Sequence, residues 1–180
     1  MRIIILGALA SVLSISQTAM ADTEECHDVE LVPETMGYHV NNGIAADGHQ
    51  IRFVSFTTAG GQSLSGSATV LSRSVNGSTV KGLELKDIGV RHASTPSPNR
   101  VIVRYTDFGG GVNLRVNGAL VVASRLGGLN DTQLGGVSVS VQESQVGSVR
   151  VGTLRLEGGI TSFVVGGRSL LLRQACGRFP

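Results

Sequence analysis

Short apolar stretches with a period of two residues recur along this chain, and they constrain its fold more than any other feature. In residues 137–141, Val137, Val139 and Val141 alternate with serines, so the valines point to one face of a strand and the serines to the other. No window keeps the i, i+3, i+4, i+7 spacing of an amphipathic helix for more than one turn. One buried and one wet face per strand predicts an all-β, antiparallel, two-sheet β-sandwich with almost no helix outside the N-terminal segment.

Eleven segments are predicted to be strands, because β-branched and other apolar residues concentrate there between clusters of Gly, Asn and Ser. They are residues 29–32, 50–56, 67–72, 83–90 (open to a break at Asp87), 100–105, 112–116, 119–124, 137–142, 149–157, 160–165 and 169–176. This number of short strands, separated by turns, predicts a sandwich or a closed barrel.

Glycine marks the predicted turns. The chain has 25 Gly but only 5 Phe, 2 Tyr and no Trp. Asn117-Gly118 predicts a two-residue hairpin, because a type I′ turn needs a positive φ at both positions. Asn76-Gly77 predicts either a second such hairpin or part of a longer polar loop. Residues 93–99 are expected to form the longest exposed loop, because the two prolines there cannot donate to a sheet.

The N-terminal 21 residues have the pattern of a secretory signal peptide. A short apolar run follows Arg2, and Ala19-Met20-Ala21 has the small-x-small pattern read by signal peptidase. The run is too short for a transmembrane helix, and no later stretch could serve as one. We therefore expect a signal peptide over residues 1–21, one sandwich domain over residues 22–180, and export to the periplasm or the cell exterior.

The charges of the remaining chain are nearly balanced. Without Arg2, 14 basic residues stand against 13 acidic ones, which gives no electrostatic footprint for nucleic acid or for anionic membranes. Six of the acids fall within the first thirteen residues after position 21, whereas arginines dominate the C-terminal tail. The two ends of the domain are thus expected to attract each other.

Two cysteines, Cys26 and Cys176, lie near opposite ends of the domain. In an exported protein we expect them to form a disulfide, which requires the first and last strands to lie side by side. Two unpaired buried thiols are the alternative. Metal ligation by the two cysteines is disfavoured, because no His or Cys partner stands at zinc-ligand spacing.

The sequence shows no catalytic constellation and no cofactor motif. The four histidines lack zinc-site spacing. Residues 41–48 predict a turn, with a structural calcium loop as the alternative. The segment around Ser63 only resembles the nucleophile elbow of serine hydrolases, because no helix is expected after it. The carboxylates that a polysaccharide-cleaving enzyme would use are Glu84, Asp87 and Asp107, although turn capping is the usual role of an Asp at a strand end.

Arginines are the candidate ligand-binding residues. Alternation turns Arg115 to the polar face of its predicted strand together with Asn113, and Arg104 is expected nearby. A planar guanidinium can bind sugar hydroxyls or carboxylates through paired hydrogen bonds. The alternative is a solvated sheet face whose charges prevent aggregation.

Four motifs carry a resemblance to a known class of proteins. They are Y-T-D-F-G-G-G-V-N-L-R-V-N-G at 105–118, L-G-G-V-S-V at 134–139, G-G-I-T-S-F-V-V-G-G at 158–167, and the closing Cys176. The stretch from Arg100 to Cys176 resembles bacterial exported β-sandwich proteins of jelly-roll or galactose-binding-like type. The resemblance implies a jelly-roll whose Cys joins the terminal strands. The acidic pair that precedes this Cys in the family is replaced by Arg and Gln, so no acid-dependent ligand is implied there.

These features together lead to three functional hypotheses. The first is a secreted, non-catalytic binding module with carbohydrate as its ligand, although sugar-binding platforms favour Trp, which is absent. The second is a structural or interaction protein of the cell envelope or extracellular matrix, with an envelope protein as partner. The third is a polysaccharide-active enzyme.

Overall fold

The chain folds as an all-β sandwich. The computed structural model describes residues 23–28, 37–46 and 49–179, so the expected signal peptide and the expected strand at 29–32 lie outside the described residues. The described helical structure is a single 3₁₀ turn, η2, at Leu126–Leu129. Within the described part of the chain, no helix has the length and apolar character needed to cross a membrane.

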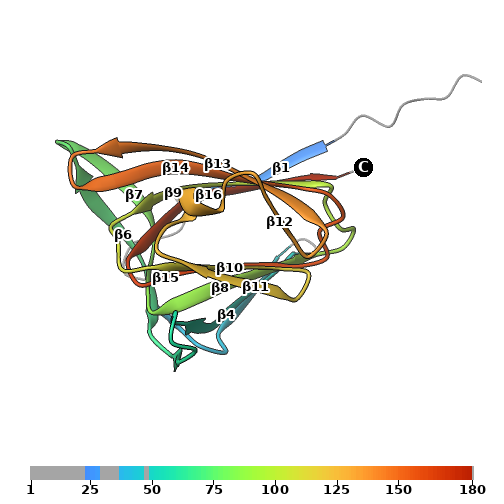
Figure 1. The fold of residues 1–180 in the computed structure, drawn as a ribbon. Helices are drawn as coiled ribbons and strands as arrows, with labels where there is room; N and C mark the ends of the chain where they lie inside the picture. Colours follow the sequence, from blue (N-terminus) through green and yellow to red (C-terminus); the bar gives the residue numbers. More distant parts are fainter. Residues whose placement is uncertain (1–22, 29–36, 47–48, 180) are drawn as a thin grey trace, which may run out of the picture.

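Two antiparallel sheets face each other as two layers (Figure 1). Sheet A has the order β12-β13-β14-β9-β16-β7-β6-β2, with β1 paired to β16. Its strands, in chain order, are β1 (Thr23–Asp28), β2 (Gly37–His39), β6 (Ser67–Val75), β7 (Ser78–Lys86), β9 (Arg100–Asp107), β12 (Thr132–Leu134), β13 (Val137–Val146), β14 (Val149–Glu157) and β16 (Leu170–Phe179).

Sheet B is the smaller layer. It has the order β11-β10-β15-β8-β4-β3, with β5 paired to β4. Its strands are β3 (Gly43–Ala46), β4 (His49–Thr57), β5 (Ser63–Leu64), β8 (Ile88–Ser94), β10 (Val112–Val116), β11 (Ala119–Ala123) and β15 (Phe163–Gly167). The chain passes repeatedly between the layers, from β7 to β8, β9 and β10 and again from β14 to β15 and β16. This alternation gives the sandwich a jelly-roll-like connectivity.

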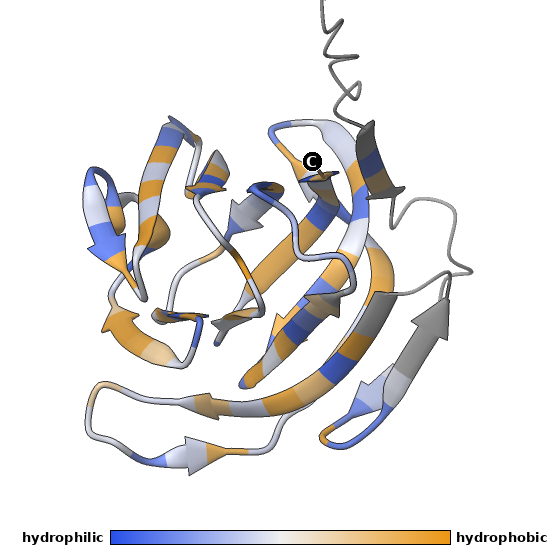
Figure 2. Ribbon diagram, turned by 90° about the vertical axis from the view of Figure 1, so that its right-hand side faces the viewer, coloured by the Kyte–Doolittle hydropathy of each residue, from blue (hydrophilic) through white to orange (hydrophobic). Residues whose placement is uncertain are grey.

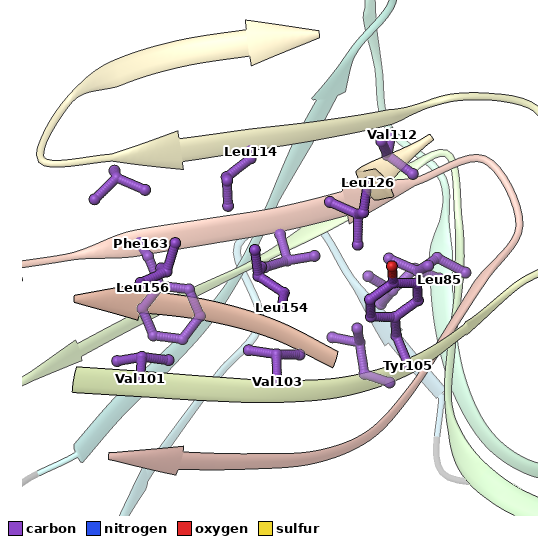
Figure 3. Close-up of a cluster of buried hydrophobic side chains, with 14 of the residues drawn as sticks. Leu85, Val101, Val103, Tyr105, Val112, Leu114, Leu126, Leu154, Leu156 and Phe163 are labelled. Carbon is purple, nitrogen blue, oxygen red and sulfur yellow. The ribbon is translucent and has the colours of Figure 1, made fainter. Parts of the chain in front are cut away.

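The core fills the space between the two sheets. Alternation along the strands is visible as bands of apolar and polar residues (Figure 2). Val101 and Val103 of sheet A and Val112 and Leu114 of sheet B belong to this core and lie on opposite sides of the interior (Figure 3). All four are at most 2% exposed, and burial of side chains of this size is the main favourable contribution to folding.

The expected strands are largely confirmed, with differences at their ends. The bounds of β10 and β14 agree with expectation, and the segment 83–90 does break at Asp87, whose φ is +53° where the chain leaves sheet A for sheet B. Strands β2, β3, β5 and β12 have only two to four residues each, so period-two alternation has too few positions to indicate them.

Two expected segments need correction. The strand predicted from residue 160 begins at Phe163, because Ile160 is buried in the core from a loop rather than from a strand. The long exposed loop predicted at 93–99 is shorter than expected. Strand β8 continues through Ser94, and Pro98 is buried.

Both Asn-Gly pairs form two-residue hairpin turns. Asn117 and Gly118 have φ values of +47° and +88°, and the flanking Val116 and Ala119 are paired in register. Asn76 and Gly77, at +48° and +80°, join β6 to β7 in the same way. The second pair is therefore a tight hairpin and not part of a longer loop.

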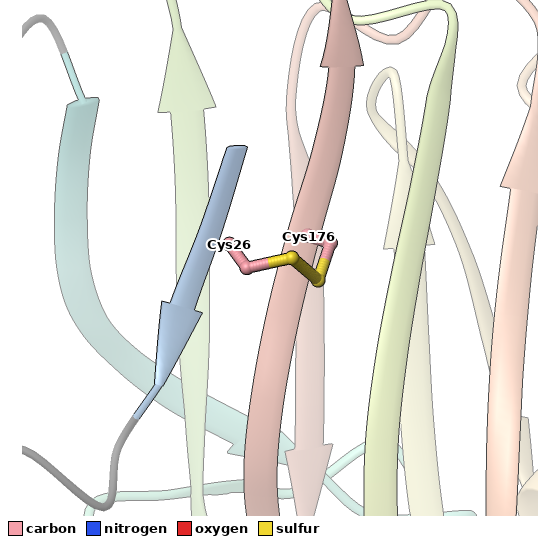
Figure 4. The surroundings of a disulfide bond; sticks show 2 residues. All are labelled: Cys26 and Cys176. Carbon is pink, nitrogen blue, oxygen red and sulfur yellow. A yellow bond between two sulfur atoms is a disulfide. The ribbon is translucent and has the colours of Figure 1, made fainter. Parts of the chain in front are cut away.

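The terminal strands lie side by side and are covalently joined. Strand β1 runs antiparallel to β16, and Cys26 is the register partner of Cys176 (Figure 4). The two residues form a disulfide with a Cα–Cα distance of 4.0 Å. Glu24 is opposite Arg178 in the same ladder, so the acidic N-terminal end does meet the basic C-terminal end.

Candidate site on the outer face of sheet B

The structure brings together two of the three residues predicted to bind a ligand. Asn113 and Arg115 both lie on β10 of sheet B and point away from the core, because Val112, Leu114 and Val116 fill the interior. Arg104 lies on β9 of sheet A, where Val103 and Tyr105 face the interior. The expected proximity of Arg104 to the other two is wrong: both sides of the sandwich have outward arginines, and strand alternation does not reveal which sheet a strand joins.

Asn113 and Arg115 line a depression of about 320 Å³ on the outer face of sheet B. Arg91 of β8 lines the same depression, which places two arginines at one site. Among the described residues, neither guanidinium forms a salt bridge with a carboxylate. Both arginine side chains are exposed. Their hydrogen-bonding groups are therefore available to a ligand.

Asn113 differs from the two arginines in being buried. It is 3% exposed, and its amide nitrogen donates to the carbonyl of Thr57 at 3.5 Å. Its Oδ1 atom has no hydrogen-bond donor among the described residues. The Asn113 side chain fits here because Gly166, its neighbour on β15, has no Cβ. A Cβ added at Gly166 would lie 2.2 Å from the Asn113 Oδ1 atom. A buried carbonyl without a donor is costly, and this oxygen packs beneath the surface against Gly166.

The depression also offers apolar contacts. Val164 of β15 and Leu120 of β11 contribute to its lining. Leu120 is 38% exposed and is the exposed large hydrophobic residue of the described chain. It is the register partner of Arg115. A few polar groups beside apolar surface is the usual composition of a small-molecule site.

Asn117 fixes one end of the depression. Its Nδ2 atom donates to the carbonyl oxygens of Gly135 and Gly159, at 3.1 and 2.7 Å. Its Oδ1 atom accepts from the backbone nitrogen and the hydroxyl of Thr161, both at 2.9 Å, and from the nitrogen of Ser162 at 3.4 Å. Since Gly118 and Ser162 line the depression, this side chain joins the hairpin turn to the loop that carries Ser162 at the rim.

Arg104 lines a separate depression of about 310 Å³ in which Arg173, Gln142 and Thr153 also take part. Its lining includes Glu143, whose carboxylate lies 3.4 Å from Arg150. An acidic group is thus already part of this surface, in contrast to the depression on sheet B.

The three carboxylates considered for catalysis have different surroundings. Glu84 is 2% exposed on the outer face of sheet A, where its carboxylate pairs with Arg73 and, at 3.1 Å, with Lys86. Asp87 lies at the corner between the sheets and pairs with Arg168 at 3.0 Å. Asp107 points to the inner face at the end of β9.

A polar cluster that the sequence did not indicate closes one end of the core. The Tyr105 hydroxyl donates to Glu143 at 2.9 Å, and the same carboxylate oxygen accepts from the nitrogen of Gly127 at 3.1 Å. Tyr105 reaches Glu143 by passing over Gly152, where a Cβ would lie 2.5 Å from the phenol oxygen. Burial and the hydrogen bond to Glu143 raise the pKa of Tyr105, so the phenol stays protonated.

Asp107 belongs to the same cluster. Its Oδ1 atom accepts from the nitrogen of Gly109 at 2.7 Å, and Oδ2 has no donor among the described residues. Burial raises the pKa of Asp107, and the nearby negative charge of Glu143 raises it further. The carboxyl is 1% exposed and lines none of the three arginine-containing depressions described for this structure. The cluster therefore serves the packing of the core end.

The sequence prediction missed Arg91 and Glu143, and only Arg91 could have been found from the sequence. Arg91 could have been found, because residues 88–91 show the same period-two alternation that indicated an outward Arg115: Ile88 and Val90 point to one face and Arg91 to the other. Glu143 has none, because it takes the inward position that valines occupy earlier in β13, and alternation predicts an apolar residue there.

The segment 41–48, predicted to be a turn with a calcium loop as the alternative, is a turn only at its start, because Gly43–Ala46 form strand β3. Asn42 accepts from the nitrogen of His39 through its Oδ1 atom at 2.7 Å, and Asn41 has a φ of +75°. Asp47 and Gly48 lie outside the described residues. Where the structure is described, no group of three or more His, Cys, Asp or Glu is placed to hold a metal ion.

The chain was compared with protein-family models, with curated proteins and with solved structures, and none of them matches it.

Proposed function

We propose that the protein is an exported, non-catalytic carbohydrate-binding module whose ligand occupies the depression on sheet B. One observation carries this proposal. Arg91 and Arg115, which form no salt bridge with a carboxylate among the described residues, lie in one depression of about 320 Å³ together with apolar side chains. A polar ligand with several hydroxyl groups matches this combination.

The chemistry of a sugar corresponds to each part of the depression. A sugar hydroxyl can accept a hydrogen bond from the guanidinium of Arg91 or Arg115, both of which are exposed in the depression. The C–H face of a sugar ring can pack on Val164 and Leu120, which takes the place of the aromatic platform that this Trp-free chain lacks. Glu84 and Asp87 each pair with an arginine, and Asp107 is 1% exposed, which favours binding without cleavage.

Export is part of the proposal and is supported by two features. The signal-like pattern of residues 1–21 is one. The Cys26–Cys176 disulfide is the other, because disulfides persist in the periplasm and outside the cell and are rare in the cytosol.

A glycan array followed by calorimetric titration of the bound glycans tests the proposal. Arg115→Ala should weaken binding at least tenfold, as expected for a lost charge-assisted hydrogen bond. Arg155→Ala is the matched control, because Arg155 is also an exposed mid-strand arginine but lies on sheet A. Arg104→Ala should leave binding unchanged.

Three results would overturn the proposal. The first is an array without signal above background, which would favour the envelope-interaction hypothesis if the protein then proved to self-associate. The second is loss of binding in Arg104→Ala but not in Arg115→Ala, which would move the site to sheet A. The third is cleavage of a bound glycan.

A further inference from the structure

Charge is divided unequally between the two sheets. None of the seven strands of sheet B contains an Asp or a Glu, although three of them carry an arginine. The acidic residues of the described strands all belong to sheet A. The outer face of sheet B is therefore a local positive surface on a chain whose net charge is only +2.

The three arginines of sheet B form a row across its strands. Arg115 of β10 is opposite Val164 of β15, Val164 is opposite Arg91 of β8, and Arg91 is opposite Arg52 of β4. Neighbouring strands lie about 4.8 Å apart. The row thus places Arg91 and Arg52 one strand apart and Arg115 about two strand spacings from Arg91, with Leu120 of β11 at its end.

Repulsion among the arginines of this row destabilises the protein when no ligand is bound. Like charges directly opposite each other on neighbouring strands destabilise a sheet, and Arg52 and Arg91 are such a pair. All three side chains are exposed, and within the described residues none of them forms an ion pair with a carboxylate. A bound anion would remove the repulsion.

The residues that line the depression also indicate which interactions can supply the binding energy for a ligand. No aromatic side chain is among its lining residues, so ring stacking cannot supply the binding energy. Hydrogen bonds to a charged group are worth more than those between neutral groups. A planar guanidinium matches a carboxylate in particular, because two parallel hydrogen bonds form at once.

We infer that the ligand is a linear acidic polysaccharide whose repeated sugars carry carboxylates, lying across the strands of sheet B along Arg115, Arg91 and Arg52. This inference rests on the proposed function and specifies its ligand class. Repeated carboxylates on one chain can engage arginines at successive strands, whereas a neutral glycan leaves the row uncompensated.

Binding of oligogalacturonate compared with its methyl ester tests this inference. The two ligands share a backbone and differ in the charge of the carboxyl group. Titration in EDTA, which prevents calcium cross-linking of the ligand, should show at least tenfold tighter binding of the free acid. Its affinity should fall as salt is raised, because these exposed charges are screened. Alginate provides a second uronate, and a neutral glucan provides a ligand without carboxyl groups.

Arginine variants locate the interaction. Arg52→Gln is informative because Arg52 lies in the row but does not line the depression; it should weaken uronate binding about tenfold and leave binding of the methyl ester unchanged. Arg155→Gln on sheet A is the matched control and should change neither. Circular dichroism melting curves of each variant verify that the fold is retained.

The possible results separate the inference from the function on which it rests. Equal affinity for acid, ester and neutral glucan would overturn the inference and leave a carbohydrate-binding module. No binding to any glycan would overturn both. Tighter binding of sulfated dextran or duplex DNA than of either uronate would overturn the carboxylate assignment, as would a loss of uronate binding in Arg155→Gln equal to that in Arg52→Gln.

Discussion

Asp107 shows at the scale of one residue how a carboxyl group can be kept in a core. One of its oxygens accepts a backbone hydrogen bond from Gly109, and the other has no donor among the described residues. Burial and the charge of Glu143 both disfavour the ionised form. The group therefore takes up a proton more readily in the folded protein than in the unfolded chain.

This raised pKa predicts that Asp107→Asn changes the pH dependence of stability. Ionising Asp107 costs more in the folded state, so the native protein loses stability as pH rises from about 4, the usual pKa of Asp, through the higher folded value. The Asn variant keeps an oxygen for Gly109 and cannot ionise. Its melting temperature relative to the native protein should increase between pH 4 and pH 8.

Thermal unfolding monitored by circular dichroism across that pH range measures the difference. Asp131→Asn is a suitable control, because it removes an exposed carboxylate whose partner is the neighbouring Asn130. A melting-temperature difference for Asp107→Asn that stayed constant with pH would contradict the prediction.

Residue-level sequence reasoning succeeded where alternation determines direction and failed where tertiary contacts do. Asn113 and Arg115 face outward as expected. Their separation from Arg104 was not expected, because it depends on β9 joining sheet A and β10 joining sheet B, which alternation does not reveal. The partnership of Tyr105 with Glu143 depends on the absence of a side chain at Gly152. That glycine lies in a different strand from either partner.

At the scale of elements, the two Asn-Gly hairpins have the same backbone turn but different surroundings. Asn117 and Asn76 both have a positive φ near 48°. The Asn117 side chain joins its hairpin to two other loops through five hydrogen bonds. In the described structure the Asn76 side chain forms none, so it serves the turn alone.

Replacing each Asn by Gly isolates this difference, because Gly accepts a positive φ and removes only the side chain. Asn117→Gly should lower the free energy of unfolding by about 2–4 kcal/mol, as expected for several lost hydrogen bonds. Asn76→Gly should change it by less than about 0.5 kcal/mol. Urea denaturation measures both, and equal losses would show that the side-chain bonds of Asn117 contribute nothing beyond the turn.

Element prediction from sequence was reliable where the local pattern and the turn chemistry agreed. The hairpin over 112–123 combines alternation with Asn-Gly, and its expected bounds are nearly those observed. The strand β15 was misplaced because Ile160 extends an apolar run without belonging to the ladder. A buried loop residue and a strand residue have the same hydropathy, so a sequence pattern cannot separate them.

At the scale of the whole molecule, the ends of the chain are held together by one ladder and one covalent bond. Strand β1 joins sheet A through its pairing with β16, and Cys26–Cys176 lies within that ladder. The sequence predicted this contact, because opposite charges and two cysteines lay at the two ends. The order of the other strands was not predictable, because they carry no cysteine pair or opposite charge clusters that would indicate which strands are neighbours.

Removal of the disulfide is therefore expected to destabilise the whole fold and to loosen β1 first. The bond closes a loop across 150 residues of sequence, which corresponds to about 5 kcal/mol in the chain-entropy model and to about 2–5 kcal/mol in typical measurements. Cys26→Ala/Cys176→Ala should unfold at lower temperature than the native protein. Its melting temperature should not respond to dithiothreitol, whereas that of the native protein should fall.

Hydrogen exchange identifies where the loosening begins. Regions held by few contacts open at the lowest free energy, and among the described strands β1 pairs with β16 alone. Amide protection in the double variant should drop first in Thr23–Asp28, while β9 and β14, which pair on both sides within sheet A, keep theirs. A uniform loss of protection would instead mean that the disulfide stabilises only through the unfolded chain, and unchanged protection with unchanged melting would show that the β1–β16 ladder holds without it.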